Sequence, residues 1–205
     1  MHARLPNFRG QRCLVLHRQD SNTDTLVRQL ESLGLTVDLR WPVEGATAEG
    51  YDVIFFDADL GYDGLFAWTP EPPPIPLIAM LGSEAPGRIE WMLAQGPAAY
   101  LIKPIGSTGV FSALAIAFHS FETEQDLKGA VTDLTERVKA RPAVFKAMVT
   151  VMDQFGIDDE EAYRLLRRES MNRRITVEAL SELIANKRYA QLGGLDMRNR
   201  RTSRS

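Results

Sequence analysis

Along the first half of the chain, short apolar runs alternate with helical patterns. The run Tyr51–Phe56 is almost continuously apolar, which is typical of a parallel strand covered on both faces. Leucines at helical spacing from Leu26 to Leu33 predict a helix that ends at Gly34, and a second helical pattern surrounds Ile89. This alternation predicts an α/β fold with a doubly wound parallel sheet. The predicted strands are Cys13–His17, Leu35–Leu39, Tyr51–Phe56, Pro76–Leu81 and Ala98–Ile102.

Beyond this region the apolar positions follow a helical period. Two runs have 4, 3, 4 spacing, with a slip between Gln125 and Leu127 and a glycine, Gly129, in the middle. Such spacing is typical of a coiled-coil seam, although one amphipathic helix lying on its own domain gives the same pattern. We predict that two chains pair through this connector to form a homodimer. The side chains expected in the seam are Phe118, Phe121, Leu127, Val131, Leu134 and Val138.

The stretch Ala143–Ile184 has the pattern of three short helices. Pro142 must kink or restart the first of them, because proline lacks the backbone N–H that a helix interior requires. Asp158 and Thr176 are placed to cap the second and third helices. The side chains expected to form a small all-α core are Val144, Ala147, Met148, Val151, Met152, Ala162, Leu165 and Leu166.

Composition argues against several classes of protein. The chain has 205 residues, with ordinary hydrophobic and charged fractions of 44% and 25%. It has no apolar window of about 18 residues and no signal-peptide pattern at its start, so we expect a cytoplasmic protein. A single cysteine, Cys13, and three scattered histidines suggest neither a disulfide framework nor a metal site. Without a nucleophile–base set or a phosphate loop, we expect no enzyme activity and no cofactor.

The net charge of −3 hides an asymmetry between the two ends of the chain. Residues 1–133 carry nine Lys and Arg against seventeen Asp and Glu, a net charge of −8. Residues 134–205 carry fifteen against ten, a net charge of +5. The two ends therefore favour different partners, and the basic end is the candidate for a polyanion, although solvated arginines on helices give the same balance.

Five arginines and a tyrosine cluster in the second of the three short helices and just beyond it. Arg164, Arg167 and Arg168 fall on one side of a helix, at i, i+3 and i+4 spacing. Arginine binds phosphate bidentately and stacks on bases, and tyrosine offers a stacking surface, so the cluster suits RNA. Alternatively, the tyrosine packs in the core and the arginines pair with glutamates of the same helix. The candidate RNA-binding residues are Lys146, Tyr163, Arg164, Arg167, Arg168, Arg173 and Arg174.

Polar residues follow the predicted strands at the edge of the sheet where such folds bind ligands. Asp57 follows the third strand, and Lys103-Pro104 follows the fifth. This arrangement resembles the receiver domain of response regulators, a flavodoxin-like fold in which an aspartate accepts a phosphoryl group and a lysine contacts it. The acidic pair that receivers use to hold Mg²⁺ is replaced here by His17 and Arg18, which offer no anionic oxygen.

We therefore predict a pseudo-receiver in which Asp57 is not phosphorylated and instead caps a strand end or pairs with Lys103. The hydroxyl residue that the family has at the end of the fourth strand is Leu81 here, with Ser83 two residues further on. The segment 60–76 is short and rich in proline, so we expect its helix to be curtailed or lost.

The three-helix stretch resembles the ANTAR domain, the RNA-binding module of a family of transcription antiterminators. The family's Lys-Gly on the first helix is Met148-Val149 here, and Lys146 is offset by about 200° around the helix, so it does not simply replace that lysine. Together with a degenerate receiver and a helical connector, the pattern resembles most closely the antiterminators of the AmiR type, which regulate aliphatic amidase operons. The matching residues are Ala147, Met152, Gly156, Glu161-Ala162-Tyr163, Leu165-Leu166-Arg167, Ser170 and Asn172-Arg173-Arg174.

The resemblance implies four segments: a receiver-like domain at 1–119, a coiled-coil connector at 120–133, an ANTAR domain at 134–195 and a basic, disordered tail at 196–205. It implies a dimeric regulator that binds leader RNA and prevents a terminator from forming. Control comes, by the same resemblance, from an AmiC-like small-molecule (amide) sensor protein. Two alternatives stay open: a phosphorylation-dependent ANTAR response regulator that uses Asp57, and a DNA-binding transcription factor.

Overall fold

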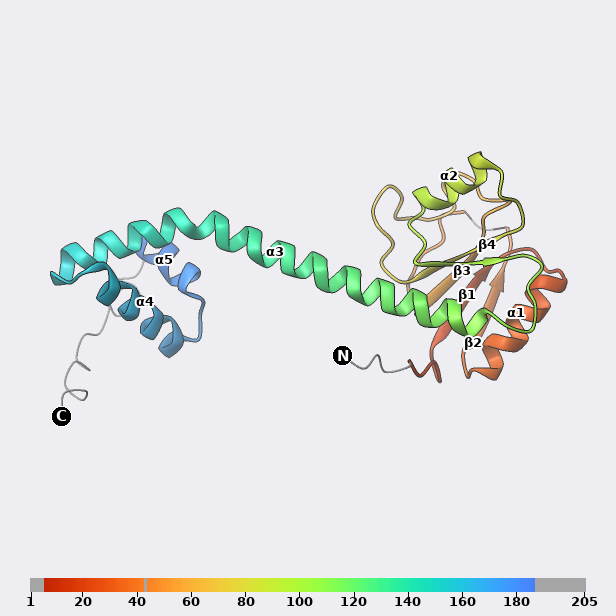
Figure 1. Ribbon diagram of the computed structural model, residues 1–205, viewed down its shortest axis with the longest axis horizontal. Coiled ribbons are helices and arrows are strands. Elements are labelled where there is room, and N and C mark those ends of the chain that lie inside the picture. Colours follow the sequence, from red (N-terminus) through yellow and green to blue (C-terminus); the bar gives the residue numbers. More distant parts are fainter. Residues whose placement is uncertain (1–5, 43, 187–205) are drawn as a thin grey trace. The chain divides into compact units, whose positions relative to one another are not determined.

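The computed structural model describes residues 6–42 and 44–186 (Figure 1). The chain divides into two compact units, Met1–Asp126 and Leu127–Ser205, here called the α/β domain and the helical domain. One helix, α3 (Val110–Phe155), contributes residues to both units. The predicted basic tail at 196–205 lies outside the described residues, as does the end of the predicted ANTAR segment.

The α/β domain is built on a five-stranded sheet in which every neighbouring pair is parallel. The strand order is β2-β1-β3-β4-β5, the order of flavodoxin-like folds. The predicted fold class is therefore confirmed, with strand ends shifted by one or two residues. The strands are β1 (Arg12–Leu16), β2 (Thr36–Arg40), β3 (Val53–Asp57), β4 (Leu77–Leu81) and β5 (Ala99–Ile102).

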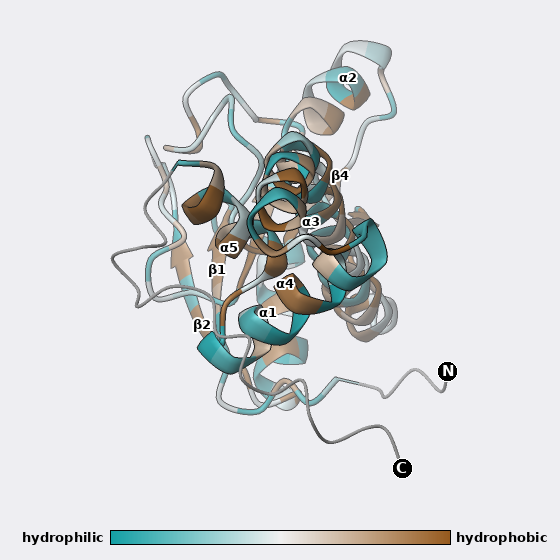
Figure 2. Ribbon diagram, turned by 90° about the vertical axis from the view of Figure 1, so that its left-hand side faces the viewer, coloured by the Kyte–Doolittle hydropathy of each residue, from teal (hydrophilic) through white to brown (hydrophobic). Residues whose placement is uncertain are grey.

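Successive strand side chains point into two different hydrophobic cores. Cys13 and Val15 join a core with leucines of α1 (Ser21–Ser32) and the beginning of α3. Leu14 and Leu16 join the other, with Met92 of α2 (Pro86–Ala94). The central strands β1, β3 and β4 therefore have to be apolar on both faces, whereas the edge strand β2 carries the charged Asp38 and Arg40. Figure 2 shows that the helices carry both hydrophobic and hydrophilic turns. None of the described helices has the length and apolarity needed to cross a membrane.

The expected alternation of strands and helices fails at two connections. Within the described residues, no helix joins β2 to β3 or β3 to β4. The expectation that the helix of segment 60–76 would be lost is confirmed. Aromatic side chains replace it on the sheet: the ring of Phe66 lies 5.3 Å from that of Phe56 and stacks on Trp68 at 4.8 Å. These large rings cover the sheet without helical periodicity, which is why the segment can be rich in proline.

The helical domain contains the rest of α3, with α4 (Asp159–Arg173) and α5 (Val177–Ala185). The predicted caps are present: an Asp158 oxygen accepts from the Glu161 N–H at 2.8 Å, and the Thr176 hydroxyl accepts from the Ala179 N–H at 3.1 Å. Gly156, with a φ of 62°, ends α3. The buried core consists of Ala147, Val151, Ala162, Leu165, Leu166, Leu180 and Ile184.

Pro142 lies inside α3, which continues through it as one helix. The sequence predicted that Pro142 either kinks or restarts the helix, and the restart is wrong. Proline removes one backbone hydrogen bond, to the carbonyl of Val138, and leaves the bonds of the turns on either side available. Ala140 and Ala147 are both buried, so packing on each side of the proline helps to hold the helix together.

Candidate functional site

Asp57 lies at the carboxyl end of β3 and is only 1% exposed. One of its carboxylate oxygens, Oδ1, accepts a hydrogen bond from the Lys103 ammonium at 2.8 Å. The other, Oδ2, lies 3.2 Å from Nε2 of His17. The pairing with Lys103 that the sequence allowed for is confirmed, and both oxygens of Asp57 are occupied by side chains of this chain.

His17 fills the position where a receiver has an acidic residue. It follows β1 directly, and its side chain is 1% exposed. Nδ1 lies 2.7 Å from the Arg18 carbonyl oxygen, so this nitrogen carries the proton that the carbonyl accepts. Nε2 is then left to face Asp57 and the Lys103 ammonium, each at 3.2 Å. The imidazole is held in place by both of its nitrogens.

Asp59 completes the cluster, and the sequence analysis did not single it out. Its carboxylate pairs with Lys103 at 2.6 Å and accepts the backbone N–H groups of Gly82 and Ser83 at 2.8 and 2.9 Å. Lys103 follows β5, whereas Gly82 and Ser83 follow β4. An acid two residues after a strand-end aspartate was the available signal, but the direction of its side chain depends on the loop.

The cluster changes the proton affinity of two of its members. Burial by itself lowers the pKa of Lys103, but hydrogen bonds to Asp57 and Asp59 outweigh burial and raise the pKa above its ordinary value. Burial likewise raises the pKa of Asp59, but the Lys103 ammonium and the two backbone N–H groups outweigh it and hold the pKa low. Both groups are therefore charged at neutral pH.

The residues at this edge of the sheet do not fit the Mg²⁺ that receivers hold. Magnesium requires oxygen ligands, usually one or two carboxylates together with phosphate and water oxygens. Here an imidazole and a guanidinium, from His17 and Arg18, follow β1, and the Lys103 ammonium already lies on the Asp57 carboxylate. Across residues 6–42 and 44–186, no group of three or more His, Cys, Asp and Glu side chains is arranged to hold a metal ion.

The arginine cluster lies along α4 and the residue that follows it. Arg164 pairs with Glu160 in an exposed ion pair, and Arg173 pairs with the buried Glu169 at 3.4 Å. Exposed pairs contribute little free energy, so Arg164 is easily given up to a stronger partner. Within the described chain, neither Arg167 nor Arg168 is in an ion pair. Glutamates therefore pair with Arg164 and Arg173 but not with Arg167 or Arg168.

Three further candidates are exposed on the helical domain. Tyr163 is 45% exposed and does not belong to the buried core, so the core alternative for this side chain is wrong. Lys146 is exposed on α3. Arg174 is also exposed and has a left-handed backbone with a φ of 55°, which ends α4 and starts the turn to α5. Met148, at the position of the family's lysine, packs against the core instead.

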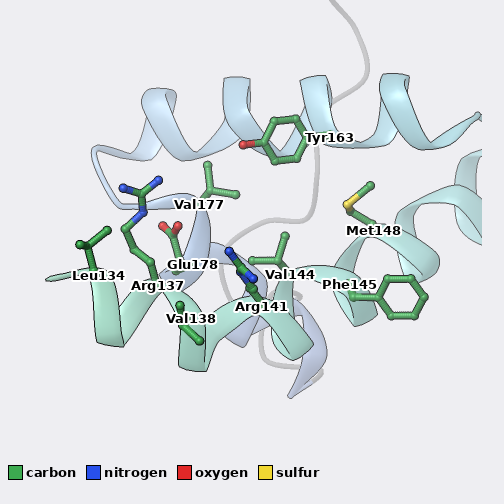
Figure 3. A pocket seen from close by; sticks show the side chains of 10 residues that line it. All are labelled: Leu134, Arg137, Val138, Arg141, Val144, Phe145, Met148, Tyr163, Val177 and Glu178. Atoms are coloured by element: carbon green, nitrogen blue, oxygen red, sulfur yellow. The ribbon is translucent and has the colours of Figure 1, made fainter. Parts of the chain in front are cut away.

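A pocket of about 370 Å³ adjoins Tyr163 in the helical domain (Figure 3). Residues of α3, α4 and α5 line it, and half of the ten were not singled out from the sequence. Helical spacing identifies which residues share a face of one helix, but a pocket formed by three helices depends on how they pack. The polar residues that line it are Arg137, Arg141, Tyr163 and Glu178.

The predicted connector residues fall into two groups. Phe118 packs against its own domain, with its ring 5.4 Å from that of Phe8, and Phe121 is half-buried. The second run is different, because its four apolar side chains are each between 55% and 64% exposed. An apolar stripe this exposed has not found a partner within its own chain. This exposed stripe consists of Leu127, Val131, Leu134 and Val138.

The α/β domain has the sheet of a receiver, but its aspartate is already paired. The helical domain has capped helices and exposed arginines. Together these features define a regulator with a degenerate receiver. Comparisons with known proteins agree. The family model for the N-terminal region of AmiR matches residues 11–118, and the model for the ANTAR domain matches residues 132–184. The chain belongs to the AmiR family of ANTAR regulators.

Two curated relatives and one solved structure illustrate the similarity. The aliphatic amidase regulator of Pseudomonas aeruginosa is 26% identical over 186 residues, which cover 89% of this chain and 95% of that protein. The transcriptional regulatory protein PdtaR of Mycobacterium tuberculosis is 26% identical over 109 residues, 53% of each chain. The response regulator StyR has a TM-score of 0.50 at 15% identity, covering 86% of this chain and 98% of its own, and supports the fold alone.

The occupied Asp57 carboxylate predicts that acetyl phosphate with Mg²⁺ leaves the intact mass of the protein unchanged. Oδ1 of Asp57 accepts a hydrogen bond from Lys103, His17 lies 3.2 Å from Oδ2, and His17 and Arg18 stand where receivers have the acidic pair that binds the metal. Mass spectrometry measures the result, with a receiver that has its acidic pair as a positive control. A stable gain of one phosphoryl group that disappears in Asp57→Ala would contradict the prediction.

The low pKa of Asp59 predicts a specific dependence of stability on pH. Its ionised form is favoured in the folded state, so its contribution is complete above the unfolded value of about 3.9 and is lost as the pH falls through the lower folded value. Asp59→Asn should therefore lower the free energy of unfolding at pH 7 and lose less of it in acid. Urea denaturation at pH 7 and at a pH below the unfolded value of about 3.9 measures the free energy of unfolding of the variant and of wild type. Asp63→Asn, at an exposed position of the neighbouring loop, is the control and should match wild type.

Proposed function

We propose that this protein is an RNA-binding antitermination regulator that binds leader RNA and prevents a terminator from forming. The observation that carries the proposal is the exposed arginine face of α4, within the segment that matches the ANTAR domain. Arg167 and Arg168, each about one turn from the exposed Arg164, give the face charges that are not paired with glutamates. Guanidinium groups bind phosphate oxygens in pairs and also stack on bases that are splayed out of an RNA loop.

A homodimer fits this role. The exposed stripe has heptad-like spacing, and pairing two copies removes four large apolar side chains per chain from water. A dimer presents two arginine faces to one RNA. Once one face has bound a hairpin, the other face is held at a high effective concentration near the second hairpin. The protein acts in the cytoplasm, where leader RNA is transcribed.

Control through a protein partner fits the α/β domain better than phosphorylation does. Asp57 is already paired, so the domain has no free carboxylate at the receiver position. The domain also has an exposed apolar face, with Leu93, Tyr100, Ile102 and Ile116 each more than half exposed around a groove of about 780 Å³. Patches of this kind mark protein contacts. We take the partner to be an AmiC-like sensor protein for small amides, by similarity to the aliphatic amidase regulator.

The RNA-binding proposal predicts the behaviour of Arg167→Ala with Arg168→Ala. Each lost phosphate contact should weaken binding to the operon's leader RNA roughly tenfold and reduce the slope of log K against log salt by about 1. Binding measured at several salt concentrations tests both effects, while light scattering should show an unchanged dimer.

Arg28→Ala with Arg88→Ala is the matched control, because it removes two exposed charges from the α/β domain and should leave RNA affinity unchanged. The matching duplex DNA is measured in parallel. Equal affinities of wild type and the α4 variant for RNA, or a preference for the duplex, would contradict the proposal.

The exposed stripe predicts that Val131→Asp with Leu134→Asp converts the dimer to a monomer, because two carboxylates per chain are placed in an apolar seam. Light scattering at micromolar concentration should give the mass of two chains for wild type and one for the variant. Gly129→Asp with Thr132→Asp adds the same charge at exposed positions on the side of the helix away from the stripe and should stay dimeric. A wild-type protein that is monomeric at this concentration removes the dimer from the proposal.

A further inference from the structure

The pocket beside Tyr163 combines an apolar lining with polar groups of three kinds. Val144, Met148 and Val177 contribute aliphatic surface, and Figure 3 shows these side chains with Tyr163 of α4 near the arginines of α3. The volume of about 370 Å³ falls in the range of about 300–1,000 Å³ that is usual for small-molecule sites. A site of this size accommodates a single planar ring system.

Tyr163 provides a flat aromatic surface at this pocket. Nearly half of the side chain is accessible, although the preceding residue, Ala162, is fully buried. The backbone of Tyr163 is therefore fixed by the core, while its ring remains available. Unpaired bases in RNA loops are held by stacking on rings of this kind.

Glu178 provides the hydrogen-bonding group. It is half-buried in the first turn of α5, and across the described residues its carboxylate makes no ion pair and no hydrogen bond. A carboxylate accepts two hydrogen bonds side by side and donates none. Among the four RNA bases, guanine alone has two adjacent donors on its Watson–Crick edge, the ring N1–H and the N2 amino group. The carboxylate therefore selects for guanine.

Arg137 and Arg141 supply positive charge at the same pocket. They are four residues apart on α3 and are both exposed, so they lie on one side of the helix. The Arg137 guanidinium is 4.0 Å from the Asp133 carboxylate, an exposed pair that a phosphate easily displaces. These two cations offset the repulsion between Glu178 and an RNA backbone.

We propose that this pocket binds one unstacked guanine of the RNA, stacked on Tyr163 and hydrogen-bonded through its Watson–Crick edge to Glu178. Arg137 and Arg141 bind the phosphates that flank this nucleotide. The inference rests on the proposed RNA-binding function and adds base selection to it: the α4 arginines supply affinity, and the pocket supplies sequence preference.

A second copy of the chain is the competing occupant, because Leu134 and Val138 border the pocket and also belong to the exposed stripe. An apolar side chain from a partner helix would cover Glu178 without giving its carboxylate a donor, which is energetically costly. A guanine satisfies that carboxylate and also covers the apolar lining. The polar groups of the pocket therefore favour the nucleotide.

The test starts from a library of RNA hairpins with randomised loops, selected on the full-length wild-type protein. The selected hairpin is then made with each of the four bases, and with inosine, at the required loop position. Inosine lacks the N2 amino group, so wild type should bind it roughly tenfold more weakly than guanine, as expected for one hydrogen bond to a charged group. Glu178→Gln should lose most of this difference.

Matched variants separate the pocket from other effects. Glu182→Gln makes the same change on α5 outside the pocket and should keep the preference for guanine over inosine. Tyr163→Ala should weaken binding roughly tenfold, and Tyr163→Phe, which keeps the ring, should bind like wild type. Circular dichroism and light scattering check that each variant is folded and dimeric.

The outcomes distinguish the pocket from the function on which it depends. If hairpins are selected and the α4 arginine variant loses affinity, but Glu178→Gln and Tyr163→Ala keep wild-type affinity and base preference, the pocket proposal is wrong and the RNA-binding proposal stands. If Tyr163→Ala changes the dimer mass while RNA affinity is unaffected, a second copy occupies the pocket. If no RNA is enriched at all, both proposals are overturned.

Discussion

The Lys103 ammonium, shared between the carboxylates of Asp57 and Asp59, is the interaction on which the α/β domain depends. Through Asp57 it connects the ends of β3 and β5, and through Asp59 it reaches the backbone that follows β4. His17 adds the end of β1. The positive and negative charges are desolvated together, so removing Lys103 would leave two carboxylates without a cation in a largely buried place. The edge of the sheet that holds a transferable phosphoryl group in active receivers here carries an internal ion cluster.

This exchange of a reactive site for a structural one has a consequence for regulation. A receiver that accepts a phosphoryl group has two states that differ in charge at one carboxylate. In this protein the Asp57 carboxylate is paired with the Lys103 ammonium, and under the proposed function the domain offers a partner a fixed surface instead of a chemical switch. Under the proposed function, regulation acts on what is exposed, namely the apolar face of the α/β domain and the exposed stripe of the connector.

Sequence patterns predicted the features that depend on local periodicity or on the general geometry of parallel sheets. The pairing of Asp57 with Lys103 followed because the carboxyl ends of parallel strands meet at one edge. The caps at Asp158 and Thr176 followed from residue types that satisfy free backbone N–H groups. Packing between distant segments was not predictable in this way. Spacing on α4 could not decide whether Tyr163 faces the core, and nothing in the sequence brings Glu178 to the same pocket.

The β5 edge of the sheet is poorly suited to strand addition. An edge strand offers free backbone groups to which another strand can add, and β5 lies at an edge of the sheet. Yet β5 has only four residues, and Pro97 and Pro104 flank it closely, each lacking a backbone donor. Strand addition would find too few hydrogen bonds to be stable. At this edge Tyr100 and Ile102 are available to other molecules through their exposed side chains and not through backbone pairing.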